Sequence, residues 1–308
     1  MKLVLSKHLF TACLAVSALL TACGGGGSSG SVPDAPTTVS VAVGPTVGSS
    51  AIVSFAAPVV VGSSAITSYK VTANPGGITA SGTASPITLT GLTPTTAYIY
   101  SVVATNAQGN SSPATSGLIN FYSVVETFRE PMTQPNDTIF TGTFTYDSTN
   151  KVVSNLAGSL TQSMTKTNPA CVGTMMTPCA YGGPMTTVAL NNQLSAVTNG
   201  TLGGQLVTTF ALNTTNTFDG GGFAPGGTQY YGLSSGTPNN HNAYAMIFVN
   251  TTDPTTVLTQ SQIDMLAYAD CTAGGMMMTS CMTGTTVAGY GRLGTMNGVP
   301  VTQVITKQ

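Results

Sequence analysis

Cysteine and methionine are the residues of this chain best suited to chemistry. Four of the six cysteines fall in two similar segments, Cys171–Cys179 and Cys271–Cys281, each of which runs from a Cys through Gly, a Met run and Thr to a second Cys. The repeat predicts two local disulfides, Cys171 with Cys179 and Cys271 with Cys281. Pairing between the segments stays open as the alternative, because four cysteines allow three pairings. Such disulfides form outside the reducing cytoplasm.

Copper binding is a second chemistry that these segments offer. Thioethers suit Cu(I), and the candidate ligands are Met175, Met176, Met276, Met277, Met278 and Met282. Methionine is also a flexible filler of packed loops, and packing is the interpretation that we favour. A blue-copper centre needs two histidines, and His241 is the only one beyond the N-terminal leader. We therefore expect neither a metal nor another cofactor.

Groups for acid–base or nucleophilic catalysis are sparse. Glu126 with Glu130, or Asp264 with Asp270, offers the carboxylate pair that glycoside hydrolysis requires. Residues 232–236 (GLSSG) match the nucleophile-elbow motif, but they lack the preceding strand and following helix that the elbow needs. We predict that the chain is not an enzyme and keep a secreted-type hydrolase of unknown substrate as the alternative.

The N-terminal segment predicts export. Lys2 and Lys7 precede the short apolar run Leu9–Leu20. A membrane-spanning helix needs about 20 apolar residues, so this shorter run is interpreted as a removable signal peptide.

The end of that run resembles the lipobox of bacterial lipoproteins. Leu20-Thr21-Ala22 leads into Cys23, and glycines and serines follow. The resemblance implies a signal peptide over residues 1–22, lipidation of Cys23 by chains such as palmitate, and a linker over residues 23–31. It also implies attachment to the membrane of the cell envelope. Because Gly24 follows the cysteine, the outer membrane is the expected site, either periplasmic or surface-exposed.

The composition predicts an all-β protein and argues against nucleic acid as a partner. Charged residues make up 6% of the 308 residues, against about 25% in an average domain. No basic patch is present, so nucleic acid is not an expected partner. Thr and Val are abundant, and both favour strands. The length fits two domains, which we place at residues 32–117 and 118–308.

Turn residues separate short alternating runs throughout the first domain, which is the rhythm of a sandwich. The expected strands are residues 37–43, 51–55, 66–71, 87–89 and 98–106. The domain resembles fibronectin type III domains in its first residues, Pro33–Pro36, and in Leu92 with Tyr98. It also resembles them in Phe55 and Tyr69, which stand at the two aromatic positions of the core. The resemblance implies a sandwich with a tyrosine corner at Leu92 and Tyr98, acting as a spacer or binding module.

No family is recognised in the second domain. Phe140, Gly142, Phe144 and Tyr146 share one face of a half-buried strand. Further expected strands are residues 152–164, 186–197, 205–212, 243–249, 285–294 and 301–306, and residues 260–269 are expected to form a short helix. These elements predict a second β-rich, sandwich-like domain.

Taken together, these features favour a non-catalytic envelope lipoprotein. We expect a structural, adhesion or binding scaffold that displays its C-terminal domain to a protein or glycan partner. A hydrolase and a periplasmic copper-binding protein are the alternatives.

Overall fold

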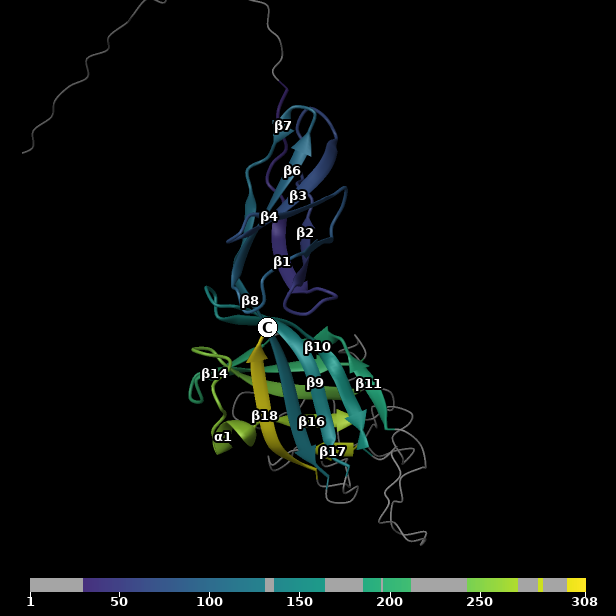
Figure 1. Ribbon diagram of the computed structural model, residues 1–308, viewed down its shortest axis with the longest axis vertical. Coiled ribbons are helices and arrows are strands. Elements are labelled where there is room, and N and C mark those ends of the chain that lie inside the picture. The colour runs from purple at the N-terminus through teal and green to yellow at the C-terminus, as the bar shows by residue number, and fades with distance from the viewer. Residues whose placement is uncertain are drawn as a thin grey trace, which may run out of the picture.

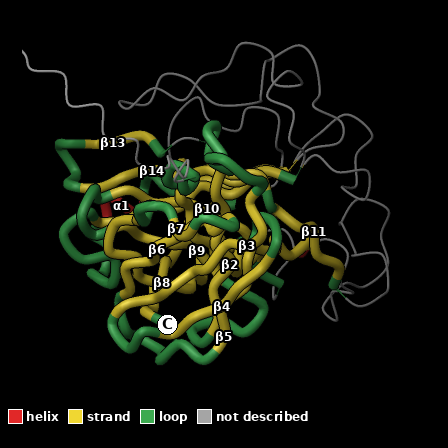
Figure 2. The backbone as a smooth tube through the Cα atoms, turned by 90° about the horizontal axis from the view of Figure 1, so that it is seen from above, coloured by secondary structure: helices red, strands yellow, loops and turns green. Residues whose placement is uncertain are grey.

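The computed structural model describes residues 30–130, 136–163, 185–194, 196–211, 243–270, 282–284 and 298–308, which form two β-sandwiches stacked along the long axis (Figure 1). Within these ranges the only helix is α1, Gln260–Ile263, and strands make up most of the rest (Figure 2). The predicted all-β class is confirmed. In the part of the chain described here, no helix has the length and apolar character needed to cross a membrane.

The N-terminal sandwich packs a three-stranded sheet against a four-stranded one. The first sheet has the order β1 (Thr37–Val43), β2 (Ser50–Ala56), β5 (Ile87–Thr90), and the second has the order β4 (Ile78–Gly82), β3 (Ile66–Asn74), β6 (Tyr98–Asn106), β8 (Ala114–Arg129), with the short β7 (Gly109–Asn110) beside β6. Alternate residues of β6 are buried, from Tyr98 to Asn106. This period of two places one face of the strand in the core between the sheets.

Strand β8 belongs to both sandwiches. Its first half pairs with β6, from Ala114 to Ile119, and its second half pairs with β18 (Val299–Lys307), from Tyr122 to Arg129. Alternation along β8 sends Ile119 and Phe121 into the N-terminal core and Tyr122, Val124 and Phe128 into the C-terminal core. The expected domain boundary at residue 117 therefore lies inside one continuous strand of 16 residues.

The C-terminal sandwich also consists of two antiparallel sheets. One has the order β18, β8, β9 (Thr138–Asp147), β10 (Val152–Gln162), β11 (Thr186–Leu190). The other contains β12 (Asn192–Gln193) and β13 (Val197–Asn199), which both pair with β14 (Gly204–Phe210), followed by β15 (Ala243–Asn250), β16 (Ala267–Asp270) and β17 (Met282–Gly284). In Figure 1 the strands of the second sheet run across those of the first.

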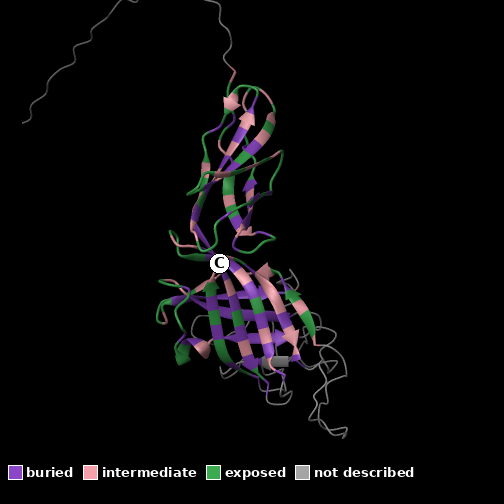
Figure 3. Ribbon diagram, viewed as in Figure 1, coloured by how far each residue is buried: buried purple, intermediate pink, exposed green. Residues whose placement is uncertain are grey.

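The expected helix over residues 260–269 is wrong beyond its first turn. Helix α1 ends at Ile263, and residues 267–270 form strand β16, which pairs with β15. All four residues of β16 are buried, as are residues 243–249 of β15 (Figure 3). A strand buried on both faces has no polar alternation, so its sequence resembles that of a buried helix.

Hydrogen bonds at the junction fix the two sandwiches to each other. The C-terminal residue Gln308 donates from its backbone N–H to the carbonyl of Phe121 (2.9 Å) and accepts from the N–H of Thr95 (2.6 Å). On the other side, the Asn155 amide donates to the carbonyl of Val41 in β1 (2.8 Å). Residues of both sandwiches thus meet on both sides of β8.

Side-chain amides extend the strand ladders where no strand is available. Phe248 of β15 lies beyond the residues that pair with β16. Its backbone N–H donates to Gln303 Oε1 (2.9 Å), and its carbonyl accepts from Gln303 Nε2 (2.6 Å). The amide of Gln303 therefore replaces a neighbouring strand and connects the two sheets.

Replacing Gln303 tests this connection. We expect Gln303→Leu to lower the free energy of unfolding by about 3 kcal/mol, because two buried backbone groups would lose their partners at a cost of about 1–3 kcal/mol each. Urea unfolding followed by circular dichroism measures the change, with the exposed neighbour Thr302→Leu as the matched control. Equal stability of the two variants would contradict a bridging role for Gln303.

Candidate functional site

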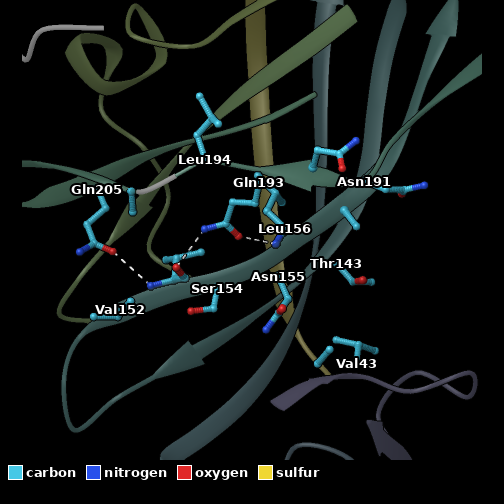
Figure 4. A pocket seen from close by; sticks show the side chains of 15 residues that line it. Val43, Thr143, Val152, Ser154, Asn155, Leu156, Asn191, Gln193, Leu194 and Gln205 are labelled. Atoms are coloured by element: carbon cyan, nitrogen blue, oxygen red, sulfur yellow. Dashed lines mark hydrogen bonds between the residues drawn. The ribbon is translucent and has the colours of Figure 1, made fainter. Parts of the chain in front are cut away.

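A cavity of about 850 Å³ lies where the two sandwiches meet (Figure 4). It is lined by residues 152–157 of β10, by residues 191–194, and by Ala42 and Val43 at the end of β1, together with Thr143, Ala196 and Gln205. We call this cavity the junction groove. Its lining side chains carry amides, hydroxyls and aliphatic groups, and none of them is charged or aromatic.

A β-bulge shapes the floor of the junction groove. The register between β10 and β9 shifts between Ser154 and Ala157, and Asn155 adopts a left-handed φ of 58°. A bulge bends the strand that carries it and redirects its side chains. Here it brings the Asn155 amide to the carbonyl of Val41 and to Thr145 Oγ1 (3.2 Å). The bulge therefore links the groove to the N-terminal sandwich.

Two glutamines complete the edge of β10 within the groove. Strand β11 pairs with β10 only from Gly158 onward. Before that point, the N–H of Val153 donates to Gln205 Oε1 (3.2 Å), the N–H of Leu156 donates to Gln193 Oε1 (2.5 Å), and Gln193 Nε2 donates to the carbonyl of Val153 (3.1 Å). These bonds, drawn in Figure 4, hold both glutamine side chains in fixed positions.

The predicted carboxylate pair Glu126 and Glu130 does not have the geometry of a glycosidase. Glu126 lies on the inward face of β8, Glu130 follows the last residue of that strand, and both are completely buried. Four residues along a strand correspond to about 13 Å, whereas hydrolytic carboxylate pairs are about 5–9.5 Å apart. Neither residue lines the junction groove or the smaller cavity beside β18. A catalytic acid must reach its substrate, and neither cavity of the described residues brings one to Glu126 or Glu130.

Glu126 is buried without compensation. Its cross-strand neighbours are Phe140 on β9 and Gln303 on β18. Neither carboxyl oxygen accepts a hydrogen bond from any residue of the described ranges. Burial alone raises its pKa well above the usual value, so the fold favours the protonated, neutral form of this side chain.

Glu130 is embedded in a network of hydroxyl groups. It accepts a hydrogen bond from the hydroxyl of Tyr268, and Thr138 Oγ1 lies 3.3 Å from that hydroxyl and 3.1 Å from Ser163 Oγ. Burial raises the pKa of Glu130 to about 7, although the hydrogen bonds from Tyr268 and Thr138 act in the opposite direction. Sequence reasoning missed Tyr268 because it treated residues 260–269 as helical.

Asp264 and Asp270, the second predicted pair, bond to different residues in the described part of the chain. Asp264 follows α1 and accepts a hydrogen bond from Gln260 Nε2 (2.8 Å). Asp270 ends β16 and accepts one from Gln162 Nε2 (2.8 Å), while Gln162 Oε1 accepts from Thr186 Oγ1 (2.6 Å). These two hydrogen bonds join the aspartates to different parts of the C-terminal sandwich.

The strand ends that border the two cysteine segments lie side by side. Gln162 and Thr186, which border the first segment, are paired, and Asp270 and Met282, which border the second, are paired. The hydrogen bond between Gln162 and Asp270 connects the two pairs. The four strand ends therefore lie at one place on the C-terminal sandwich.

Several predicted site residues fall outside the described ranges. They are Cys23, Cys171, Cys179, Cys271, Cys281, Met175, Met176, Met276, Met277, Met278 and His241, together with the motif at residues 232–236, while Met282 is described only as a backbone position in β17. Lipidation, the disulfides and copper binding stay predictions. Among the residues that are described, no group of three or more His, Cys, Asp and Glu is placed to hold a metal ion.

The N-terminal sandwich contains two aromatic features that the sequence singled out. Phe55 of β2 and Tyr69 of β3 contact each other across the core, with ring centroids 4.8 Å apart. The Tyr98 hydroxyl accepts a hydrogen bond from the N–H of Thr93 (2.8 Å), five residues upstream, and Leu92 beside it is buried. A tyrosine bonded back to the chain in this way is the tyrosine corner of immunoglobulin-like sandwiches.

The family model described as "Fibronectin type III domain" matches residues 34–120. These residues form a fibronectin type III domain. The match extends three residues beyond the expected end at residue 117, into the part of β8 where Ile119 packs in the domain core. In many proteins, type III domains are binding or scaffold modules.

Solved structures with type III domains are also similar to this chain. Domains A168–A170 of titin are 25% identical over 28% of this chain and 32% of that chain, with a TM-score of 0.26. Titin kinase with its flanking domains is 17% identical over 42% and 30%, with a TM-score of 0.24. The FN1–FN3 domains of chicken CNTN1 are 10% identical over 90% and 99%, with a TM-score of 0.23. This chain thus spans about a third of the titin structures. A search of curated proteins finds no match.

We expect the uncompensated burial of Glu126 to make stability depend on pH. Between a pH of about 4.5 and the raised pKa, the folded protein holds a proton that the unfolded chain has released. Stability therefore falls as the pH rises, by about 1.4 kcal/mol per pH unit for this one group. Glu130, with its pKa of about 7, adds to the slope below that pH.

Glu126→Gln removes the titrating group while keeping its shape. The variant is expected to be more stable than the parent chain at pH 7.5 and equally stable near pH 4.5, as measured by urea unfolding across this range. The exposed Asp34→Asn removes the same charge from the surface and serves as the control. If the free energy of unfolding changed with pH in the same way for Glu126→Gln and the parent chain, Glu126 would not be the cause of the pH dependence.

Two tyrosines of β6 offer a matched test of the tyrosine corner. Tyr98→Phe is expected to lower the free energy of unfolding by about 1–2 kcal/mol, because the N–H of Thr93 loses its partner. The hydroxyl of Tyr100 is buried and accepts or donates no hydrogen bond within the described ranges, so Tyr100→Phe is expected to be neutral or stabilising. Thermal unfolding of both variants gives the comparison. An equal loss of stability in the two variants would contradict a stabilising role for the tyrosine corner.

Proposed function

We propose that this protein is a non-catalytic, lipid-anchored scaffold of the bacterial cell envelope. In this proposal the type III domain holds the C-terminal sandwich away from the membrane at a fixed orientation. The C-terminal sandwich then meets a protein or glycan partner outside the lipid surface.

The shared strand β8 is the observation that carries the proposal. A flexible linker between two domains allows them to rotate independently, whereas β8 is hydrogen-bonded in both sandwiches along its 16 residues. At about 3.3 Å per residue the strand is roughly 50 Å long. A continuous strand of this length transmits position and orientation from one domain to the next.

The position of the first described residues supports the same proposal. The purple start of the described chain lies at the end of the type III domain that is far from the C-terminal sandwich (Figure 1). Ser31 is held there by Ser63, whose hydroxyl accepts from its N–H (2.7 Å), and by Asn106, whose amide donates to its carbonyl (3.0 Å). A Gly/Ser linker from Cys23 would reach about 15 Å from this end. The attachment point and the displayed domain are then at opposite ends.

The polar surface favours recognition without long-range electrostatics. Charged residues are 6% of the chain, and the formal net charge is −1. Such a protein attracts charged ligands only weakly over distance. We infer that its partner is met at short range through shape and hydrogen bonds, as suits a tethered scaffold.

Changing the proposed lipidation site tests the anchor. Cys23→Ser is expected to leave the precursor unprocessed by the lipoprotein signal peptidase and to abolish labelling by radioactive palmitate. Cys13→Ser, which alters the other cysteine of the leader, is the matched control and is expected to be labelled and processed normally. Palmitate labelling of Cys23→Ser, or processing of the parent chain that globomycin does not inhibit, would overturn the anchor.

A further inference from the structure

We propose that the junction groove binds a segment of an uncharged glycan. The groove lies between the type III domain and the C-terminal sandwich, where residues of both contribute to its wall. Its volume of about 850 Å³ falls within the range of small-molecule sites, which occur preferentially at domain interfaces.

The chemistry of the lining selects the ligand class. A charged ligand would lose hydration without gaining an ionic partner, because no lining side chain is charged. A ligand recognised by ring stacking would find no aromatic face among the lining residues. Amides and hydroxyls both donate and accept hydrogen bonds, as sugar hydroxyls do. An uncharged, hydroxyl-rich ligand matches this surface.

Two amides of the groove are held in place while part of their bonding capacity stays open. Gln205 uses Oε1 on the backbone of Val153, and Asn155 uses Nδ2 on Val41 and Thr145. Gln205 Nε2 and Asn155 Oδ1 have no hydrogen-bond partner in the described ranges, and neither do the side chains of Ser154 and Asn191. Groups fixed before binding cost less entropy when a ligand arrives.

A peptide is a poorer fit than a glycan at the same place. An extended peptide binds a sheet edge by pairing with its free backbone groups. Along residues 153–156 of β10, the side chains of Gln193 and Gln205 already occupy the N–H groups of Val153 and Leu156 and the carbonyl of Val153. This edge is therefore closed to strand addition, whereas a glycan needs only the side-chain groups that face the groove.

Calorimetric titration of the full chain tests the proposal. The protein is purified in a detergent without a sugar headgroup and titrated with maltohexaose, cellohexaose and chitohexaose as neutral probes, and with oligogalacturonate as the charged probe. Concentrations reach about 10 mM, which detects a millimolar dissociation constant. We expect at least one neutral probe to bind and the charged probe not to bind.

Two groove variants and one control locate the binding. Asn191→Ala removes an exposed side chain without a structural bond and is expected to weaken binding at least fivefold, the effect of losing one hydrogen bond of about 1 kcal/mol. Ser154→Trp fills the groove and is expected to abolish binding. Thr198→Trp places the same bulk on exposed β13, outside the groove, and is expected to bind normally.

The outcomes separate the groove from the proposed scaffold role. Failure of every neutral probe to bind, or binding that Ser154→Trp leaves unchanged, would overturn the glycan site while leaving the anchor tests untouched. Preferential binding of an unstructured peptide at the groove would overturn the ligand class. Unchanged melting temperatures of the variants show that loss of binding is not loss of folding.

Discussion

The pairing of one strand with partners in both sandwiches is the constraint on which this structure depends. Strand β8 changes partners from β6 to β18 at about residue 120. At the same point its buried side chains pass from the core of the N-terminal sandwich to the core of the C-terminal one. Because side chains of a strand point to opposite faces in turn, neighbouring residues such as Phe121 and Tyr122 serve different cores. A slip of one residue in the register would therefore misplace the apolar residues of both domains at once.

The scarcity of charge makes side-chain amides the main polar connectors. Gln193 and Gln205 complete the edge of β10, Gln303 completes the edge of β15, and Gln262 connects α1 to the carbonyl of Leu202 (2.9 Å). An amide carries a donor and an acceptor, as a peptide group does, so it can replace one step of a ladder without a charged group that must lose its hydration.

The sequence was informative where strands are exposed on one face and uninformative where both faces are buried. In the type III domain, polar residues alternate with apolar ones, and the expected strands at residues 37–43 and 98–106 have the observed ends. In β16 the residues Ala267–Asp270 are all buried, and the pattern was mistaken for a helix. The junction groove was not predicted at all, because it joins Val43, Asn155 and Gln205, which only the folded chain brings together. Nor does the sequence show that Glu126 has no hydrogen-bond partner among the described residues, since its neighbours come from strands β9 and β18.

Because the groove is built from both domains, its integrity depends on the junction. Val41 and Val43 belong to β1 of the type III domain, whereas Asn155 belongs to the bulge of β10, and one hydrogen bond between Asn155 and Val41 fixes their relative position. Any ligand that binds only the assembled groove stabilises the contact between the domains by mass action. The reverse also holds, since a free-energy coupling between two processes is reciprocal. The geometry of the groove thus depends on the rigidity of the junction. The shared strand that orients the C-terminal sandwich also keeps the groove in its binding geometry.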